Sequence, residues 1–150
     1  MEQRIKKKDG FQGQKLISIP RQVINSKCVK NEIINSLYIT DIGYYPKARF
    51  HYMERPQGAD QFIFIYCHDG KGEVQIKKNT YSLEAGDYIV IPLKAAHAYH
   101  ADEDEPWSIY WVHFKGNTAH KIVAALESRK ALQGFIRFNE KLIELFGEMY

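Results

Sequence analysis

Short runs of alternating hydrophobic and polar residues, separated by turns that contain glycine or proline, fill most of the chain between residues 37 and 116. Residues 62–67 (FIFIYC) are instead apolar on both faces, which is typical of a strand buried between two layers. A glycine-rich turn at 68–72 follows this run. The spacing predicts about eight or nine short strands folded into a sandwich or a small barrel.

The alternation in two of these strands sorts their side chains onto two faces. If residues 48–55 (ARFHYMER) are extended, then His51, Met53 and Arg55 share one face. Alternate residues of 107–114 share a face in the same way: Trp107, Ile109, Trp111 and His113. We predict that one face of each of these strands lines a core or a pocket.

Strand boundaries are less regular in the first third of the chain. Residues 37–42 (LYITDI) form a strand candidate, and the segment 43–46 (GYYP) is predicted to end it. Residues 1–36 show only weak periodicity. Within them, residues 16–19 (LISI) predict a short strand or an arm laid across the domain.

The hydrophobic period changes after Gly116. Two groups of apolar residues recur at helical spacing: Ala119, Ile122, Val123 and Leu126, then Phe138, Leu142, Leu145, Phe146 and Met149. Asn139 is a candidate cap for the second helix. Because the chain stops at Tyr150, directly after this helical pattern, we expect it to be part of a longer protein.

Composition narrows the class of protein. At 150 residues and 45% hydrophobic content, one domain with its own core is expected. The net charge is +3, and we interpret the basic run at 4–8 (RIKKK) as a solvated tail rather than a nucleic-acid patch. The two cysteines, Cys28 and Cys67, form no CxxC pair, which argues against a disulfide framework or a zinc site. With no secretion signal and no apolar run of roughly 20 residues, a cytoplasmic protein without a membrane partner is expected.

The central stretch resembles the second motif of the cupin barrels. Gly86, Pro92 and His97 stand at matching places, while Lys94 replaces the second glycine of the motif and Ala101 replaces its asparagine. Metal-dependent cupins also carry a His-x-His pair and a glutamate in their first motif. In this chain His51 stands alone there, because position 53 is a methionine, which is a poor ligand for hard or borderline ions. His97 is therefore predicted to be a pocket or strand residue, and no metal or other cofactor is expected.

A more specific resemblance covers residues 37–116 and extends weakly through both helices. ERPQGADQFIFIYCHDGKGEVQI, followed by YSLEAGDYIVIPLKAAHAYHADEDEPWSIYWVHFKG, is similar to the N-terminal ligand-binding domain of AraC-family transcription regulators. The resemblance implies a cupin domain that binds a small effector, commonly a sugar, and helps the protein to dimerise. It also implies a separate C-terminal domain with two helix-turn-helix units, for which this chain has no room.

The family resemblance assigns roles to particular residues. Arg55, next to a proline, matches an arginine that bonds sugar hydroxyls, and Tyr99 matches a sugar-contacting tyrosine two residues after the motif histidine His97. Trp111 matches a tryptophan that stacks on the sugar ring. Ile109 stands where an arabinose-binding member has a histidine, which implies a different or larger ligand. Members also fold an N-terminal arm over the pocket.

Each assignment has an alternative that the residues leave open. Arg55 can instead pair with a surface acid such as Glu54 or Asp60, and Tyr99 and Trp111 can be core residues. These alternatives predict no binding role for the three side chains.

We therefore predict a mainly β fold, in which a cupin-like double-stranded β-helix (a jelly-roll barrel) is followed by two C-terminal α-helices. An N-terminal arm and first strands are assigned to residues 1–36, the effector-binding barrel to 37–116, and a helical segment that packs on the barrel to 117–150. The predicted ligand-binding residues are those named by the resemblance: Arg55, Tyr99, Trp111, His97 and Ile109.

The favoured function is a sensing and dimerising domain of an AraC-type transcription regulator, and not an enzyme. Its partners would be a small effector, a mono- or oligosaccharide by its chemistry, a second copy of the chain, and DNA only through a domain beyond residue 150. One alternative is a metal-dependent cupin enzyme, such as an isomerase or dioxygenase. Another is a metal-free binding barrel without a DNA partner. The sequence does not identify the effector or the target genes, or whether the regulator activates or represses them.

Overall fold

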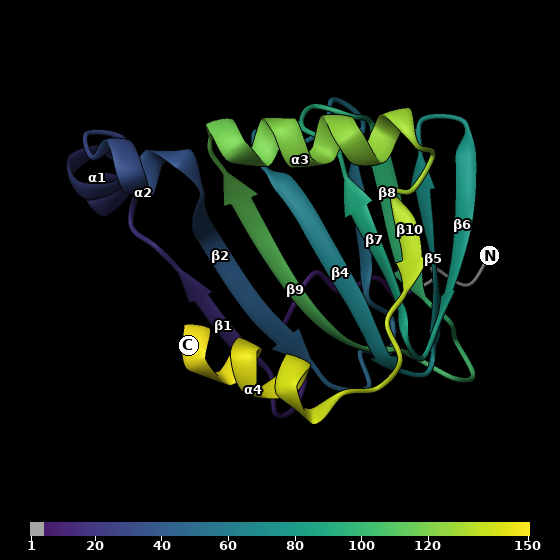
Figure 1. Cartoon of the computed structure of the whole chain (residues 1–150). Helices are drawn as coiled ribbons and strands as arrows, with labels where there is room; N and C mark the ends of the chain where they lie inside the picture. The colour runs from purple at the N-terminus through teal and green to yellow at the C-terminus, as the bar shows by residue number, and fades with distance from the viewer. Residues whose placement is uncertain (1–4) are drawn as a thin grey trace.

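The computed structural model describes residues 5–150, and these fold into two sheets and several helices (Figure 1). The strands are β1 (Lys15–Ser18), β2 (Tyr38–Tyr45), β3 (Tyr52–Arg55), β4 (Phe62–Asp69), β5 (Lys71–Ile76), β6 (Asn79–Glu84), β7 (Asp87–Ile91), β8 (His97–Ala101), β9 (Ser108–Lys115) and β10 (Gln133–Phe135). The helices are α1 (Arg21–Val23), a π-helical turn η1 (Ile24–Cys28), α2 (Glu32–Ser36), α3 (Asn117–Ser128) and α4 (Glu140–Met149).

The strands form a six-stranded sheet in the order β1-β2-β9-β4-β7-β10 and a four-stranded sheet in the order β3-β8-β5-β6. Every named strand pair is antiparallel. The main core draws on both sheets, with Ile65 and Trp111 from one and Val74 and Tyr99 from the other. This arrangement confirms the predicted mainly β, cupin-like barrel followed by helices.

Strand β4 is the centre of the larger sheet, between β9 and β7. Its apolar residues are buried on both faces because the second sheet covers one face and helices cover the other. Ile63 and Ile65 belong to the core between the sheets, whereas Phe62 packs with Val123 of α3. Cys67 is fully buried, and the pKa of its thiol is raised to about 12 by that burial. The prediction of a strand buried between layers is confirmed.

Two strand boundaries predicted from the sequence are wrong. Strand β2 continues through Gly43 to Tyr45, because β1 pairs with it on one side and β9 on the other. The glycine permits a close contact with a tryptophan and makes no turn. Strand β3 begins only at Tyr52, because Lys47 and Phe50 have positive φ angles of 40° and 67° and bend the chain before it.

Several elements had no clear sequence signal. The helices between Arg21 and Ser36 are short and leave Ile33 83% exposed, so they show no amphipathic period. Asn31 caps α2 by accepting hydrogen bonds from the backbone N–H groups of Ile33 and Ile34. Strand β10 has three residues, too few to show an alternation, and is defined by its pairing with β7.

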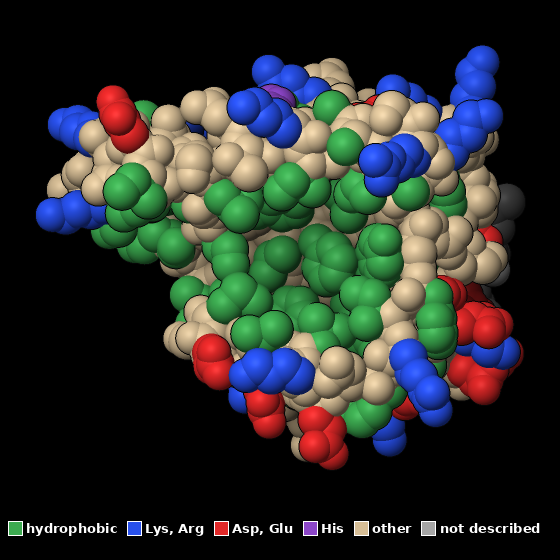
Figure 2. Space-filling model, viewed as in Figure 1, with side chains coloured by type: hydrophobic (Ala, Val, Ile, Leu, Met, Phe, Trp, Pro, Cys, Tyr) green, Lys and Arg blue, Asp and Glu red, His purple; other side chains and the backbone are tan. Residues whose placement is uncertain are grey.

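Both predicted C-terminal helices are present, and both lie across the outer face of the six-stranded sheet (Figure 1). The Asn139 side chain accepts a hydrogen bond from the backbone N–H of Lys141 and caps α4, as predicted. Phe146 of α4 packs against Tyr110, with ring centroids 4.9 Å apart. An apolar hollow remains between the two helices (Figure 2). No helix within residues 5–150 has the length and apolar character needed to cross a membrane.

Candidate ligand-binding site

A cavity of about 50 Å³ lies inside the barrel, between the two sheets and beneath the N-terminal segment. Side chains from both sheets and one from the N-terminal segment line it: Lys8, Tyr45, His51, Met53, Arg55, Ile63, Ile65, Tyr99, Ile109, Trp111 and His113. One wall is aliphatic and aromatic, and the other carries nitrogen and oxygen donors. Such a lining suits a small molecule with one apolar face and one polar edge.

Four of the five residues predicted from the sequence line this cavity: Arg55, Tyr99, Ile109 and Trp111. His97 does not line it, and its Nε2 lies 3.1 Å from Arg55 Nη1. His97 therefore holds the arginine and does not form part of the wall.

Arg55 extends from the end of β3 toward β8, and its Nη1 also donates a hydrogen bond to the Tyr99 hydroxyl over 3.3 Å. The alternative pairing with surface acids is wrong. Glu54 accepts a hydrogen bond from the Tyr52 hydroxyl instead, and Asp60 pairs with Lys115. The arginine is thus oriented by neutral partners, so its charge is not neutralised by them.

The hydrogen bonds around His97 fix its tautomer. Its Nδ1 lies 2.8 Å from the carbonyl oxygen of Ala95, which can only accept, so Nδ1 carries the proton. Nε2 is then the acceptor for Arg55. Burial lowers the pKa of His97, partly offset by the bond to Ala95, and the charge of Arg55 lowers it further. The ring is neutral and acts as a fixed acceptor behind the guanidinium group.

His51 is the most deeply buried histidine of the site, at 3% exposure. The Trp107 Nε1–H donates to its Nδ1 over 3.2 Å, so the neutral ring carries its proton on Nε2. Burial, and secondarily the charge of Arg55, lower its pKa to about 3. His51 therefore brings one N–H donor to the cavity lining. Within residues 5–150 no group of three or more His, Cys, Asp or Glu side chains could hold a metal ion.

Trp111 forms the aromatic wall of the cavity and is 8% exposed. Its ring meets Tyr45 edge to face, with centroids 5.4 Å apart. Its buried Nε1–H has no hydrogen-bond partner in the described part of the chain. Because an unpaired buried donor costs about 1–3 kcal/mol, this N–H marks a place where an acceptor is missing.

The N-terminal segment lies against the barrel beside the cavity. Two backbone hydrogen bonds attach Lys7 to the start of β3. The Lys7 N–H donates to the carbonyl oxygen of Phe50, and the Lys7 carbonyl oxygen accepts from the N–H of Tyr52. Phe11 packs on Tyr45 and His51, with centroid distances of 5.1 and 5.3 Å. The basic run at 4–8 was predicted to be a solvated tail; the Lys7 side chain is exposed, but its backbone is paired with the barrel, and Arg4 lies outside the described residues.

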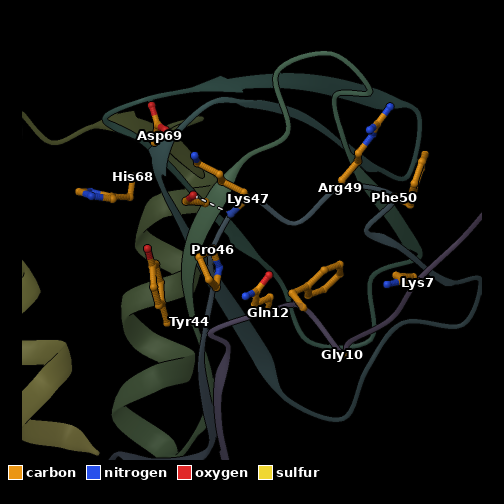
Figure 3. Close-up of a pocket in the computed structure, with 12 residues that line it drawn as sticks. Lys7, Gly10, Gln12, Tyr44, Pro46, Lys47, Arg49, Phe50, His68 and Asp69 are labelled. Atoms are coloured by element: carbon orange, nitrogen blue, oxygen red, sulfur yellow. Dashed lines mark hydrogen bonds between the residues drawn. The ribbon is translucent and has the colours of Figure 1, made fainter.

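An open groove of about 660 Å³ lies on the outer side of this segment (Figure 3). Tyr44, Pro46, Lys47 and Arg49 line it, and so does Phe11. Phe11 thus lines the groove and also packs on Tyr45 and His51, two residues that line the cavity.

The sequence indicated part of the remaining lining. His51 and Met53 were predicted to share a face with Arg55, and His113 with Trp111, and these pairings of faces are confirmed. Tyr45 was missed because its strand was expected to end earlier. Lys8 carried no signal, since its place depends on how the N-terminal segment crosses the barrel.

The fold and a cavity that both sheets line define the chain as a mainly β barrel with an internal candidate binding site. Comparison with known families is more specific. Residues 42–150 match the AraC-like ligand binding domain. Because the match covers most of the chain, the protein belongs to this family.

Curated relatives carry regulator names. The MmsAB operon regulatory protein of Pseudomonas aeruginosa is 33% identical over 107 residues, which are 69% of this chain and 34% of the relative. The Msm operon regulatory protein of Streptococcus mutans is 30% identical over 94 residues, 63% of this chain and 33% of the relative. The raffinose operon transcriptional regulatory protein of Pediococcus pentosaceus is 32% identical over 56 residues, which are 37% of this chain and 20% of the relative. The matched regions span about a third or less of these relatives' lengths.

Solved structures of cupin type are similar at lower identity. The cupin domain of Schizosaccharomyces pombe Cnp3 is 17% identical with a TM-score of 0.46, covering 75% of this chain and 72% of that one. A cupin-like protein of Thermotoga maritima is 15% identical with a TM-score of 0.44, covering 71% and 68%.

Proposed function

We propose that this barrel is the effector-sensing domain of an AraC-type transcription regulator, and that it binds a small polar molecule of the carbohydrate class in the cavity. The observation that carries the proposal is the convergence of Arg55, Tyr99 and Trp111 on one cavity. Family membership and the operon-regulator names of the relatives support it, including one relative named for raffinose.

The chemistry of the lining suits a sugar or a sugar derivative. An indole such as Trp111 packs on the C–H face of a pyranose ring, and polar groups on the opposite wall address its oxygens. Arg55 offers a planar fork of donors, and the Tyr99 hydroxyl both donates and accepts. Because Ile109 and Ile65 lie on the apolar side, the ligand would be held with one apolar face inward.

The size of the cavity requires movement on binding. About 50 Å³ holds a few water molecules, whereas small-molecule sites measure about 300–1,000 Å³. Displacement of Phe11 would join the cavity to the neighbouring groove of about 660 Å³. Effector binding then shifts the population between two positions of the N-terminal segment, by as much as its affinity for the two states differs.

DNA binding and dimerisation belong to the same proposal. DNA would be bound by a C-terminal domain outside these 150 residues, in the cytoplasm. A second copy could cover the apolar hollow between α3 and α4, where Leu145 and Met149 remain almost half exposed (Figure 2). Burial of such a surface against an identical partner is the usual way to remove it from water.

Thermal unfolding across a ligand panel tests the proposal. The panel contains neutral mono- and oligosaccharides, including raffinose, together with aldonic, uronic and short hydroxy acids. A ligand at a hundredfold excess over its dissociation constant adds about 2.7 kcal/mol to the free energy of unfolding, which raises Tm by several degrees. Trp111→Ala should abolish the rise, and Leu145→Ala on the outer face should keep it. A panel in which no compound changes Tm would overturn the proposed function.

A further inference from the structure

Both charged side chains that line the cavity, apart from its histidines, are cationic. Arg55 and Lys8 both line it, and no Asp or Glu is among the residues that do. Within residues 5–150, no carboxylate lies within 4.0 Å of the Arg55 guanidinium. A cation that is partly buried without a counter-charge is costly, and within the described residues Arg55 has no carboxylate in direct contact.

The nearby acids are engaged elsewhere. Asp41 accepts a hydrogen bond from Thr40 and pairs with His113 at 3.5 Å, and its pKa is lowered to about 2, mainly by the hydrogen bond from His113. Asp60 pairs with Lys115. Both carboxylates therefore have cationic or donor partners of their own and form no ion pair with Arg55.

Two neutral side chains of the lining carry N–H donors. Trp111 Nε1–H is buried without an acceptor, and His51 Nε2 carries the ring proton because Trp107 donates to Nδ1. A molecule that satisfies these groups must present several acceptor oxygens. A neutral sugar hydroxyl gives one acceptor with one donor, whereas a carboxylate gives two acceptor oxygens and no donor.

We propose that the effector carries a carboxylate, as in an aldonic acid, a uronic acid or a short hydroxy acid, and that this group binds Arg55 and attracts Lys8. The inference rests on the proposed function, because it names the chemical class of the same effector. A planar guanidinium group binds a carboxylate through two parallel hydrogen bonds. Lys8 belongs to the N-terminal segment, so the same anion favours the closed position of that segment.

Matched pairs of acid and neutral compounds test this inference by isothermal titration calorimetry. The pairs are D-glucuronate and D-glucose, D-galacturonate and D-galactose, D-gluconate and sorbitol, and L-lactate and 1,2-propanediol, with D-glucose 6-phosphate as a different anion. We expect at least one acid to bind about tenfold or more tightly than its neutral partner, since hydrogen bonds to charged groups contribute about 1.5–3 kcal/mol. Binding of the acid should weaken as salt is raised.

Substitutions of Arg55 and Lys8 test whether these two residues contact the carboxylate. Arg55→Gln keeps a donor for Tyr99 and His97 but removes the charge, and it should reduce the affinity for the acid about tenfold or more while leaving any weak neutral binding unchanged. Lys8→Gln should have a smaller effect in the same direction. Lys6→Gln is the matched control, because the Lys6 ammonium lies over the Tyr52 ring, 3.9 Å from its centroid, and Lys6 does not line the cavity.

The two proposals fail differently. If a neutral sugar binds at Trp111 as tightly as its acid partner, or if Arg55→Gln leaves acid binding unchanged, the carboxylate inference is overturned and the sensing function stands. Preference for the phosphate ester over every carboxylate overturns it too. If no compound of either kind binds, both proposals are overturned.

Discussion

The indole ring of Trp111 lies directly against the backbone of Gly43, its cross-strand partner in the β2–β9 pair. A Cβ atom at position 43 would lie 2.3 Å from Cε2 and Cζ2 of that ring. The aromatic wall of the cavity therefore depends on the absence of a side chain one strand away. This contact also explains why a glycine that reads as a strand end in the sequence lies inside a continuous strand.

Gly43→Ala should destabilise the domain and displace Trp111. Overpacking of this kind costs about 1–3 kcal/mol, which lowers Tm by several degrees, and the displaced ring should no longer stack on a ligand. Thermal unfolding and near-ultraviolet circular dichroism measure the two effects. Gly147→Ala in α4 is the control, because a Cβ there meets nothing within 4 Å and should be neutral or slightly stabilising. Equal Tm values for the two variants would contradict the contact.

The buried His51 should make stability depend on pH between about 7 and 3. Its pKa is about 3 in the folded protein, against 6.5 for an unperturbed histidine, so the unfolded chain binds about one more proton over this interval. Stability is therefore full above pH 6.5 and falls as the pH is lowered, by about 2 kcal/mol from this group between pH 7 and pH 5.

Urea unfolding at pH 5, 6 and 7 measures this dependence. His51→Gln, whose side-chain oxygen can still accept from Trp107, should make the slope shallower by about one proton. His120→Gln, at an exposed position, should leave the slope as it is. A slope in His51→Gln equal to that of the parent would show that His51 does not titrate as a buried neutral ring.

Phe11→Ala should open the cavity without unfolding the barrel. The ring is 7% exposed and packs on Tyr45 and His51, while the N-terminal segment otherwise depends on the two backbone hydrogen bonds of Lys7. Faster hydrogen exchange at the Lys7 and Tyr52 amides, and stronger quenching of tryptophan fluorescence by acrylamide, are expected. Ile5→Ala, at a residue 61% exposed, should change neither signal. Exchange rates that stay at the parent value in Phe11→Ala would show that the ring does not hold the segment.

Asn139→Ala should weaken the attachment of α4. The Asn139 side chain accepts from the Lys141 N–H, and loss of such a cap costs about 0.5–2 kcal/mol. Helix α4 should fray first, which is measurable as lost far-ultraviolet helical signal below the main transition. Asn117→Ala is the comparison, since α3 begins after Gly116 without a side-chain cap. If both variants melt alike, the Asn139 cap contributes nothing.

Much of the barrel could be predicted from the sequence because its strands alternate or are apolar on both faces. The same alternation placed His51, Met53 and Arg55 together, and joined His113 to Trp111. What the pattern could not show is a contact across strands. Gly43 was interpreted as a turn residue because its partner, the Trp111 ring, is far away in the sequence.

The role of His97 illustrates a second limit. Its place in the cupin motif predicted a strand or pocket residue, and the structure places it in β8, where its ring contacts Arg55 while Tyr99 lines the cavity. The alternation of residues along a strand predicts the face of the sheet on which a side chain lies. It does not predict which of two residues on that face, here His97 or Tyr99, lines the cavity. Likewise the basic character of Lys8 gave no hint of its position, since that depends on the path of a segment with weak periodicity.

Neighbouring residues of β9 point to opposite faces of the six-stranded sheet. Trp111 lines the cavity, while Val112 lines the apolar hollow beside α4 and Tyr110 packs on Phe146. Only the thickness of this one β-sheet thus separates the proposed effector cavity from the surface on which α4 packs. A displacement of Trp111 would therefore act on the same strand that carries the packing surface of α4.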